Sequence, residues 1–120
     1  MTLRSLADSR PLRFLFWAAA SFAFVMAVVP DPPHIPGEPN DKVQHVVAFA
    51  SLALLGSWAY TATKPLKLLA WLSLFGGVIE IVQAIPMLHR DSDVLDWIAD
   101  SVAVAVMLLL VRVLRRRASA

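Results

Sequence analysis

The side chains of this chain that could carry out acid–base or binding chemistry gather between two long apolar runs. Residues 80–100 hold five carboxylates together with Gln83, His89 and Arg90. An ionisable group inside or beside a membrane span is energetically costly, which makes it a candidate for a functional site. Glu80 and Gln83 lie three residues apart and therefore share one helix face. Beyond the turn, three carboxylates follow at spacings of i, i+3 and i+7: Asp93, Asp96 and Asp100.

A second polar group, Asp41-Lys42-x-x-His45, opens another apolar run. Asp41 and His45 are one helical turn apart. A helix cap, an interfacial lysine and a hydrogen-bonded core histidine would also account for this motif. For Glu80 and Gln83 the alternative is a structural hydrogen bond to a neighbouring helix. Asp100 has no such simple alternative, because it lies two turns inside an apolar segment.

The composition indicates an integral membrane protein. Of the 120 residues, 58% are hydrophobic and only 17% are charged, and the mean hydropathy is +0.65. Soluble domains are nearer a quarter charged, and a soluble helical bundle needs a polar stripe along each helix. Runs such as 66–79 and 101–111 offer almost none. The absence of cysteine excludes disulfides, thiolate catalysis and Cys-based metal or haem sites.

We predict an all-α fold: one membrane domain, residues 1–120, with four transmembrane helices. Five prolines between residues 30 and 39 place a loop after the first helix, because proline removes a backbone donor and breaks helices. The first segment could also be a signal peptide with a small-x-small site at residues 21–23, but its apolar run continues past that site. The predicted spans are about 12–29, 43–60, 66–87 and 93–114.

The basic residues predict the orientation of these spans. With both termini cytoplasmic, nine of the 11 Lys and Arg residues lie on the inside and only Lys42 and Arg90 lie outside. The arginines after residue 111 then act as an anchor at anionic lipid rather than as a nucleic-acid patch. Eight of the nine acidic residues lie toward the outer face.

The predicted spans also give a depth for each polar side chain. At 1.5 Å per residue, Glu80 and Asp100 lie ~10 Å beneath the outer boundary, since each is seven residues from the end of its span. This predicts a deep layer of Glu80 and Asp100 and a polar pocket that opens to the outside. The middle layer would hold His45, Gln83 and Asp96, and the rim would hold Asp41, Lys42, Arg90 and Asp93.

Taken together, these motifs resemble the VanZ-like family of small multi-pass bacterial membrane proteins. The resemblance covers about residues 41–111. It consists of Asp-Lys-x-x-His-x-x-x-Phe opening one helix, Glu-x-x-Gln ending the next, and Arg with Asp-x-x-x-Asn at the start of the last; the matching residues are Asp41, Lys42, His45, Phe49, Glu80, Gln83, Arg90, Asp93 and Asp96. Asp100 departs from the family, which prefers Asn there. The resemblance implies a place in the bacterial plasma (inner) membrane and a link to glycopeptide (teicoplanin) resistance.

Three hypotheses for the function follow. The first is binding or modification of an envelope lipid or cell-wall precursor at the outer leaflet, with His45, Glu80 and Asp96 as acid–base catalysts. The residues that would bind the substrate are Asp41, Lys42, Gln83, Arg90, Asp93 and Asp100.

The second hypothesis is a proton- or cation-linked carrier subunit, which four short helices would form only as an oligomer. Against it, the nearest polar residues further inward are Ser73 and Ser101. The third is a non-catalytic membrane scaffold. Divalent metal binding by His45, Glu80, Asp96 and Asp100 is chemically feasible, but the spacing does not predict a metal site. No motif predicts a cofactor or a nucleic-acid partner.

Overall fold

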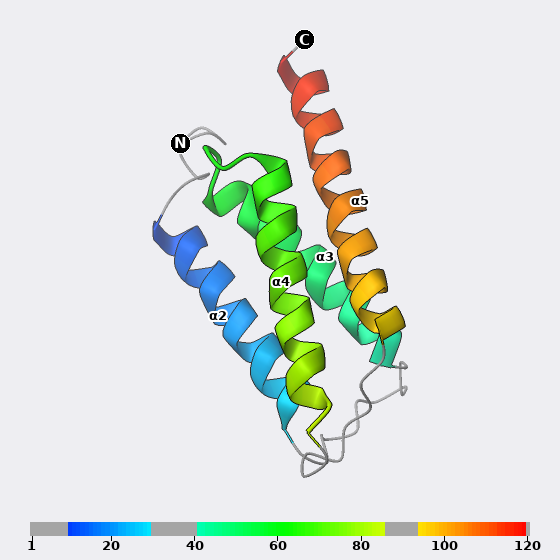
Figure 1. Ribbon diagram of the computed structural model, residues 1–120. Coiled ribbons are helices and arrows are strands. Elements are labelled where there is room, and N and C mark those ends of the chain that lie inside the picture. The colour runs from blue at the N-terminus through cyan, green and yellow to red at the C-terminus, as the bar shows by residue number, and fades with distance from the viewer. Residues whose placement is uncertain (1–9, 30–40, 86–93, 120) are drawn as a thin grey trace.

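The computed structural model describes residues 10–29, 41–85 and 94–119, which form four antiparallel helices (Figure 1). These are α2 (Arg10–Val28), α3 (Asp41–Ala59), α4 (Pro65–Gln83) and α5 (Val94–Ser119). Each of the four predicted spans is a helix, so the all-α prediction is confirmed. Three of them, α2, α4 and α5, are long and apolar enough to cross a membrane, and the apolar part of α3, Val43–Ala59, is shorter.

Two helix ends differ from the prediction. Helix α4 ends at Gln83, four residues before the predicted end at Met87. The backbone amide of Ala84 closes the last turn on carbonyls of Glu80 and Ile81, and Pro86 disfavours helix in the residue before it. Helix α5 instead continues to Ser119, where basic side chains in the last turn complement the negative end of the helix dipole.

The outer surface of the bundle is apolar, as a lipid environment requires. Large hydrophobic side chains on every helix are exposed, among them Phe14, Val47, Leu66, Ile81 and Leu109. In water these side chains would form an extensive apolar patch of the kind that marks a membrane or protein interface. The bundle therefore has the surface of a protein that spans a bilayer.

All four helices contribute to the core of the bundle, and its innermost part lies between α3, α4 and α5. The largest fully buried apolar side chains are Phe49, Leu52, Ile79 and Val104. Helix α2 packs at the side of this group (Figure 1). The ring of Phe75 on α4 packs against Phe24 of α2 and Phe49 of α3. Helices α3 and α5 make the most extensive contact in the bundle.

Gly76 of α4 lies close to side chains of both α3 and α5. A Cβ atom added at Gly76 would lie 3.3 Å from the ring of Phe49 and 3.5 Å from Oδ2 of Asp100. Phe49 is only 2% exposed and has little room to move. Small residues allow helix backbones to approach in membranes, and Gly76 does so beside a buried carboxylate.

The two ends of the bundle differ in chemistry. Helix α2 begins, and α5 ends, at the end that carries the turn between α3 and α4 (Figure 1). This basic end carries Lys64 and the arginines of α5. The opposite end carries the start of α3, the end of α4 and the start of α5, with the acidic residues. The start of α2 and the end of α5 lie at the same end of the bundle, as the predicted topology requires. The side of the membrane on which this end lies rests on the positive-inside pattern.

The orientation can be tested by labelling single cysteines, because the chain contains none. Ala62 and Ala118 are exposed at the basic end and Ala84 is exposed at the acidic end. We expect a membrane-impermeant maleimide to label Ala84→Cys in intact cells and to label Ala62→Cys and Ala118→Cys only after permeabilisation. The reverse pattern would place the acidic end in the cytoplasm.

Candidate functional site: a buried His–Asp–Glu cluster

Three polar side chains from three helices meet near the acidic end of the bundle. They are His45 of α3, Glu80 of α4 and Asp100 of α5. One ring nitrogen of His45 and one carboxylate oxygen each of Glu80 and Asp100 all lie within 4.8 Å of one another. Asp100 is completely buried and Glu80 is 7% exposed. We call these three residues the polar cluster.

The strongest defined contact in the polar cluster joins His45 to Asp100. The distance between Nδ1 of His45 and Oδ2 of Asp100 is 3.2 Å. An ionised carboxylate can only accept hydrogen bonds, so Nδ1 carries the hydrogen and donates it when Asp100 is ionised. The other ring nitrogen, Nε2, is then the one available to accept a proton when His45 is neutral.

Asp100 has one oxygen that this contact does not use. Its Oδ1 is buried and has no hydrogen-bond partner among the described residues. A buried polar atom without a partner costs free energy comparable to a lost hydrogen bond, and such atoms in native structures call for an explanation. The polar cluster thus holds an unused acceptor on a side chain with no exposed surface.

The other two carboxylates differ in their relation to the polar cluster. Glu80 is part of it and also takes part in a further interaction. Asp96 is 9% exposed and is not one of the three residues whose nitrogen or oxygen atoms lie within 4.8 Å of one another. Like Glu80, it takes part in a further interaction. Both carboxylates lie near enough to His45 to act on it electrostatically. Asp96 is therefore a neighbour of the polar cluster rather than a member.

Gln83 makes a hydrogen bond to the first helix. Its Nε2 donates to the backbone carbonyl of Ala27 on α2 at 2.8 Å, and the residue is 2% exposed. Its Oε1 has no hydrogen-bond partner among the described residues. The alternative of a structural hydrogen bond to a neighbouring helix thus describes the amide group of Gln83.

The predicted depth of Glu80 requires a correction. Glu80 lies three residues before the end of α4, or ~4.5 Å along the helix axis, instead of the expected seven. The earlier end of α4 explains this difference. His45, which was predicted in the middle layer, contacts Asp100 of the deep layer. Glu80 and Asp100 are buried, and because the residues expected at the rim lie outside the described side chains, the opening of the pocket stays a prediction.

Four of the predicted site residues lie outside the described side chains. Arg90 and Asp93 fall between the described ranges. Asp41 and Lys42 belong to the first turn of α3, but only their backbone is described. Their roles stay predictions.

The structure also defines polar contacts that the sequence could not pair. The hydroxyls of Ser73 on α4 and Ser101 on α5 are 2.9 Å apart. The indole Nε1 of Trp97 donates to the carbonyl of Ser73 at 2.9 Å. In the sequence, these two serines are the nearest polar residues inward from the carboxylates. Only the helix packing shows that they face each other.

Comparison with known proteins gave no match: no family model, curated protein or solved structure is significantly similar to the chain.

The hydrogen bond of Gln83 gives a testable distinction between a structural and a binding role. We expect Gln83→Leu to lower the free energy of unfolding in mixed detergent micelles by about 0.6 kcal/mol, the average for a hydrogen bond in a membrane protein. The variant should otherwise behave as wild type in cells. A folded Gln83→Leu protein that has lost its cellular activity would show instead that Gln83 takes part in binding.

Proposed function

We propose that the protein acts on an envelope lipid or lipid-linked cell-wall precursor in the outer half of the bilayer. The observation that carries this proposal is the meeting of His45, Glu80 and Asp100 from three helices. Buried ionisable groups in a membrane bundle are expensive and typically serve a pathway, a relay or a ligand. Their position at the acidic end, opposite the arginines of α5, supports an outer-leaflet substrate.

In this proposal each residue of the polar cluster has a definite role. Asp100 holds the imidazole of His45 through Nδ1, which leaves Nε2 as general base or acid. Glu80 provides the second proton-transfer group or a hydrogen bond to a substrate hydroxyl. Asp96 acts on His45 through its charge. Lys42 and Arg90 remain proposed ligands for a phosphate-like anion, because ammonium and guanidinium groups suit that chemistry.

The VanZ-like pattern of motifs adds a direction for the search for a substrate. It links a polar site of this kind to glycopeptide resistance, and therefore to the precursors that glycopeptides recognise. The motifs are short and the comparisons found no family match. The proposal therefore stands on the polar cluster, and the resemblance selects which envelope compounds to measure first.

The experiment is lipid and cell-wall precursor profiling of deletion cells complemented with variants of the chain. We expect Glu80→Gln to abolish complementation, because an amide cannot transfer a proton. Asp100→Asn should retain most of it, because the amide oxygen can still accept from Nδ1 of His45. Asp100→Leu should lose it. Teicoplanin susceptibility of the same strains is a second readout.

Membrane levels of each variant, measured by immunoblot, control for folding. Wild-type profiles for Glu80→Gln at normal expression would reject the acid–base role of the polar cluster. Loss of complementation in Asp100→Asn would show that the carboxylate charge is required, and would favour the second candidate function.

That second candidate is binding of a divalent cation by the polar cluster. It is favoured by a specific observation: three donor atoms within 4.8 Å, with a buried Asp100 oxygen that no described group satisfies. One imidazole nitrogen and two carboxylates form a donor set that suits Mn²⁺, Fe²⁺ or Zn²⁺. Such an ion would neutralise the two carboxylates and could orient an anionic substrate.

A transport role has weaker support. Inward from the polar cluster, the buried stripe of α5 continues with Val104 and Leu108, and that of α4 with Leu72 and Leu68. Ser73 and Ser101 bond to each other beside it. The described part of the bundle therefore contains an apolar barrier below the polar cluster. A carrier would need a path that these helices do not provide.

Metal binding is tested on protein purified in detergent and stripped with chelator. After incubation with Mn²⁺ or Zn²⁺ and gel filtration, we expect about one ion per chain by elemental mass spectrometry. Asp100→Asn should lose it, since an amide is a weaker ligand than a carboxylate. Asp96→Asn, which alters a carboxylate outside the polar cluster, is the matched control and should retain the ion. Equal binding by the two variants would contradict this assignment.

A further inference from the structure

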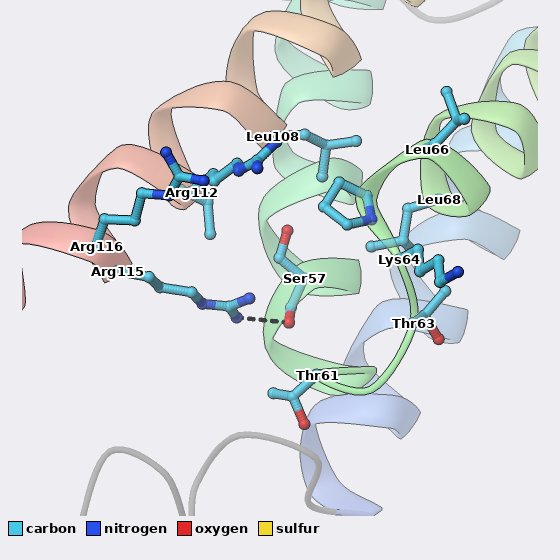
Figure 2. Close-up of a pocket in the computed structure, with 12 residues that line it drawn as sticks. Ser57, Thr61, Thr63, Lys64, Leu66, Leu68, Leu108, Arg112, Arg115 and Arg116 are labelled. Carbon is cyan, nitrogen blue, oxygen red and sulfur yellow. Dashed lines mark hydrogen bonds between the residues drawn. The ribbon is translucent and has the colours of Figure 1, made fainter. Parts of the chain in front are cut away.

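A cavity of about 680 Å³ lies at the basic end of the bundle, far from the polar cluster. It is an open hollow lined by the end of α3, the turn before α4, the first turn of α4 and the second half of α5 (Figure 2). Its volume is in the range of pockets that hold small molecules. None of its twelve lining residues is acidic, and four carry a positive charge: Lys64, Arg112, Arg115 and Arg116.

The wall that α5 contributes changes character along the helix. Leu108 and Val111 are buried and apolar, and Arg112, Arg115 and Arg116 follow. These positions are spaced at i, i+3, i+4, i+7 and i+8, so they form one continuous face. The cavity is therefore apolar toward the middle of the bundle and cationic toward the end of the helix.

Arg115 is held in place at the base of this cationic part. Its guanidinium donates to the backbone carbonyl of Ser57 on α3 at 2.7 Å, the dashed contact in Figure 2. This bond ties the end of α5 to the end of α3 and fixes one positive charge at the cavity wall. Lys64 lies across the cavity from α5, and its amino group points away from the arginines in this view.

The arrangement of charge favours an anion. Arg112 and Arg116 are one turn apart, and like charges at this spacing repel each other. No lining residue offers a carboxylate to offset them. The lining hydroxyls of Thr61 and Thr63 add hydrogen-bond donors. Guanidinium groups bind phosphate in a bidentate manner, which makes a phosphate the best match for this wall.

We infer that this cavity binds the phosphate headgroup of an anionic phospholipid, with Arg112 and Arg116 as its principal ligands. A phospholipid is complementary to the cavity wall along its length. Its apolar chain would lie against the apolar part of the wall, and its anionic phosphate against the cationic part. Leu66 at the rim is 76% exposed, which gives an acyl chain an apolar surface to follow out of the bundle. Basic pockets between membrane helices on the cytoplasmic side bind headgroups in this way.

This inference is distinct from a general basic anchor. A diffuse attraction to an anionic surface would depend on every exposed arginine of the tail, because each contributes through its charge alone. A defined headgroup site depends on the arginines that line the cavity. Arg117 is exposed on the same helix, one residue beyond Arg116, and does not line the cavity. It is therefore a matched control of equal charge.

The test is native mass spectrometry of the protein in neutral detergent, titrated with phosphatidylglycerol and, separately, with phosphatidylcholine. We expect wild type to retain one phosphatidylglycerol and to bind phosphatidylcholine far more weakly. The double variant Arg112→Gln/Arg116→Gln should bind phosphatidylglycerol at least ten times more weakly, roughly as expected when two juxtamembrane charges are lost. Arg117→Gln should stay within about twofold of wild type.

Two outcomes would overturn the inference. Equal weakening by Arg117→Gln and by single Arg112→Gln or Arg116→Gln variants would reduce the effect to a diffuse anchor. Displacement of the lipid by an equal concentration of inorganic phosphate would assign the cavity to a soluble anion instead. Thermal unfolding of each variant in the same detergent confirms that it is folded, and the pair Arg112→Lys/Arg116→Lys, which keeps both charges, should recover part of the binding.

Discussion

The burial of Asp100 against His45 is the interaction on which the arrangement of the acidic end depends. On insertion scales an aspartate costs about 2.5–3.5 kcal/mol at the centre of a membrane helix, and Asp100 lies nearer the start of α5. One hydrogen bond between membrane helices returns about 0.6 kcal/mol on average. The single 3.2 Å contact with His45 therefore adds little stability by itself. The polar cluster is best explained by what it does rather than by the stability it adds, and Gly76 and Phe49 shape the space that holds it.

The buried faces of α3 and α5 carry polar groups at both ends and apolar side chains between them. On α5 the order is Asp100, then Val104 and Leu108, then Arg112. On α3 it begins with His45 and continues through Phe49 to Ser57, whose carbonyl accepts from Arg115. The bundle thus has an acidic centre at one end, an apolar middle and a cationic cavity at the other. The apolar middle separates the two polar regions, so a ligand at one end need not disturb the chemistry at the other.

Much of this architecture could be predicted from the sequence, because long apolar runs interrupted by proline and charge leave few alternatives. Helical periodicity placed Glu80 and Asp100 on inward faces. It could not show that Gln83 turns to the carbonyl of Ala27, since a side chain has several acceptors within reach. Nor could it give the depth of Glu80, because that depth depends on where α4 ends, and α4 ends earlier than predicted. The cationic cavity could not be predicted either, because its wall joins α5 to a turn more than forty residues away in the sequence.

The charge state of the polar cluster links its two candidate functions. Two ionised carboxylates no more than 4.8 Å apart would repel by at least about 3.5 kcal/mol at an effective dielectric constant of 20. A proton shared within the polar cluster removes this repulsion, and so does a divalent cation. With a proton, Oδ1 of Asp100 still lacks a partner among the described residues, whereas a cation would use it. An asparagine at this position would keep the hydrogen bond to His45 and remove the repulsion altogether. An aspartate at position 100 is therefore best explained by a positive charge bound in the polar cluster. An asparagine there would leave one negative charge fewer to balance.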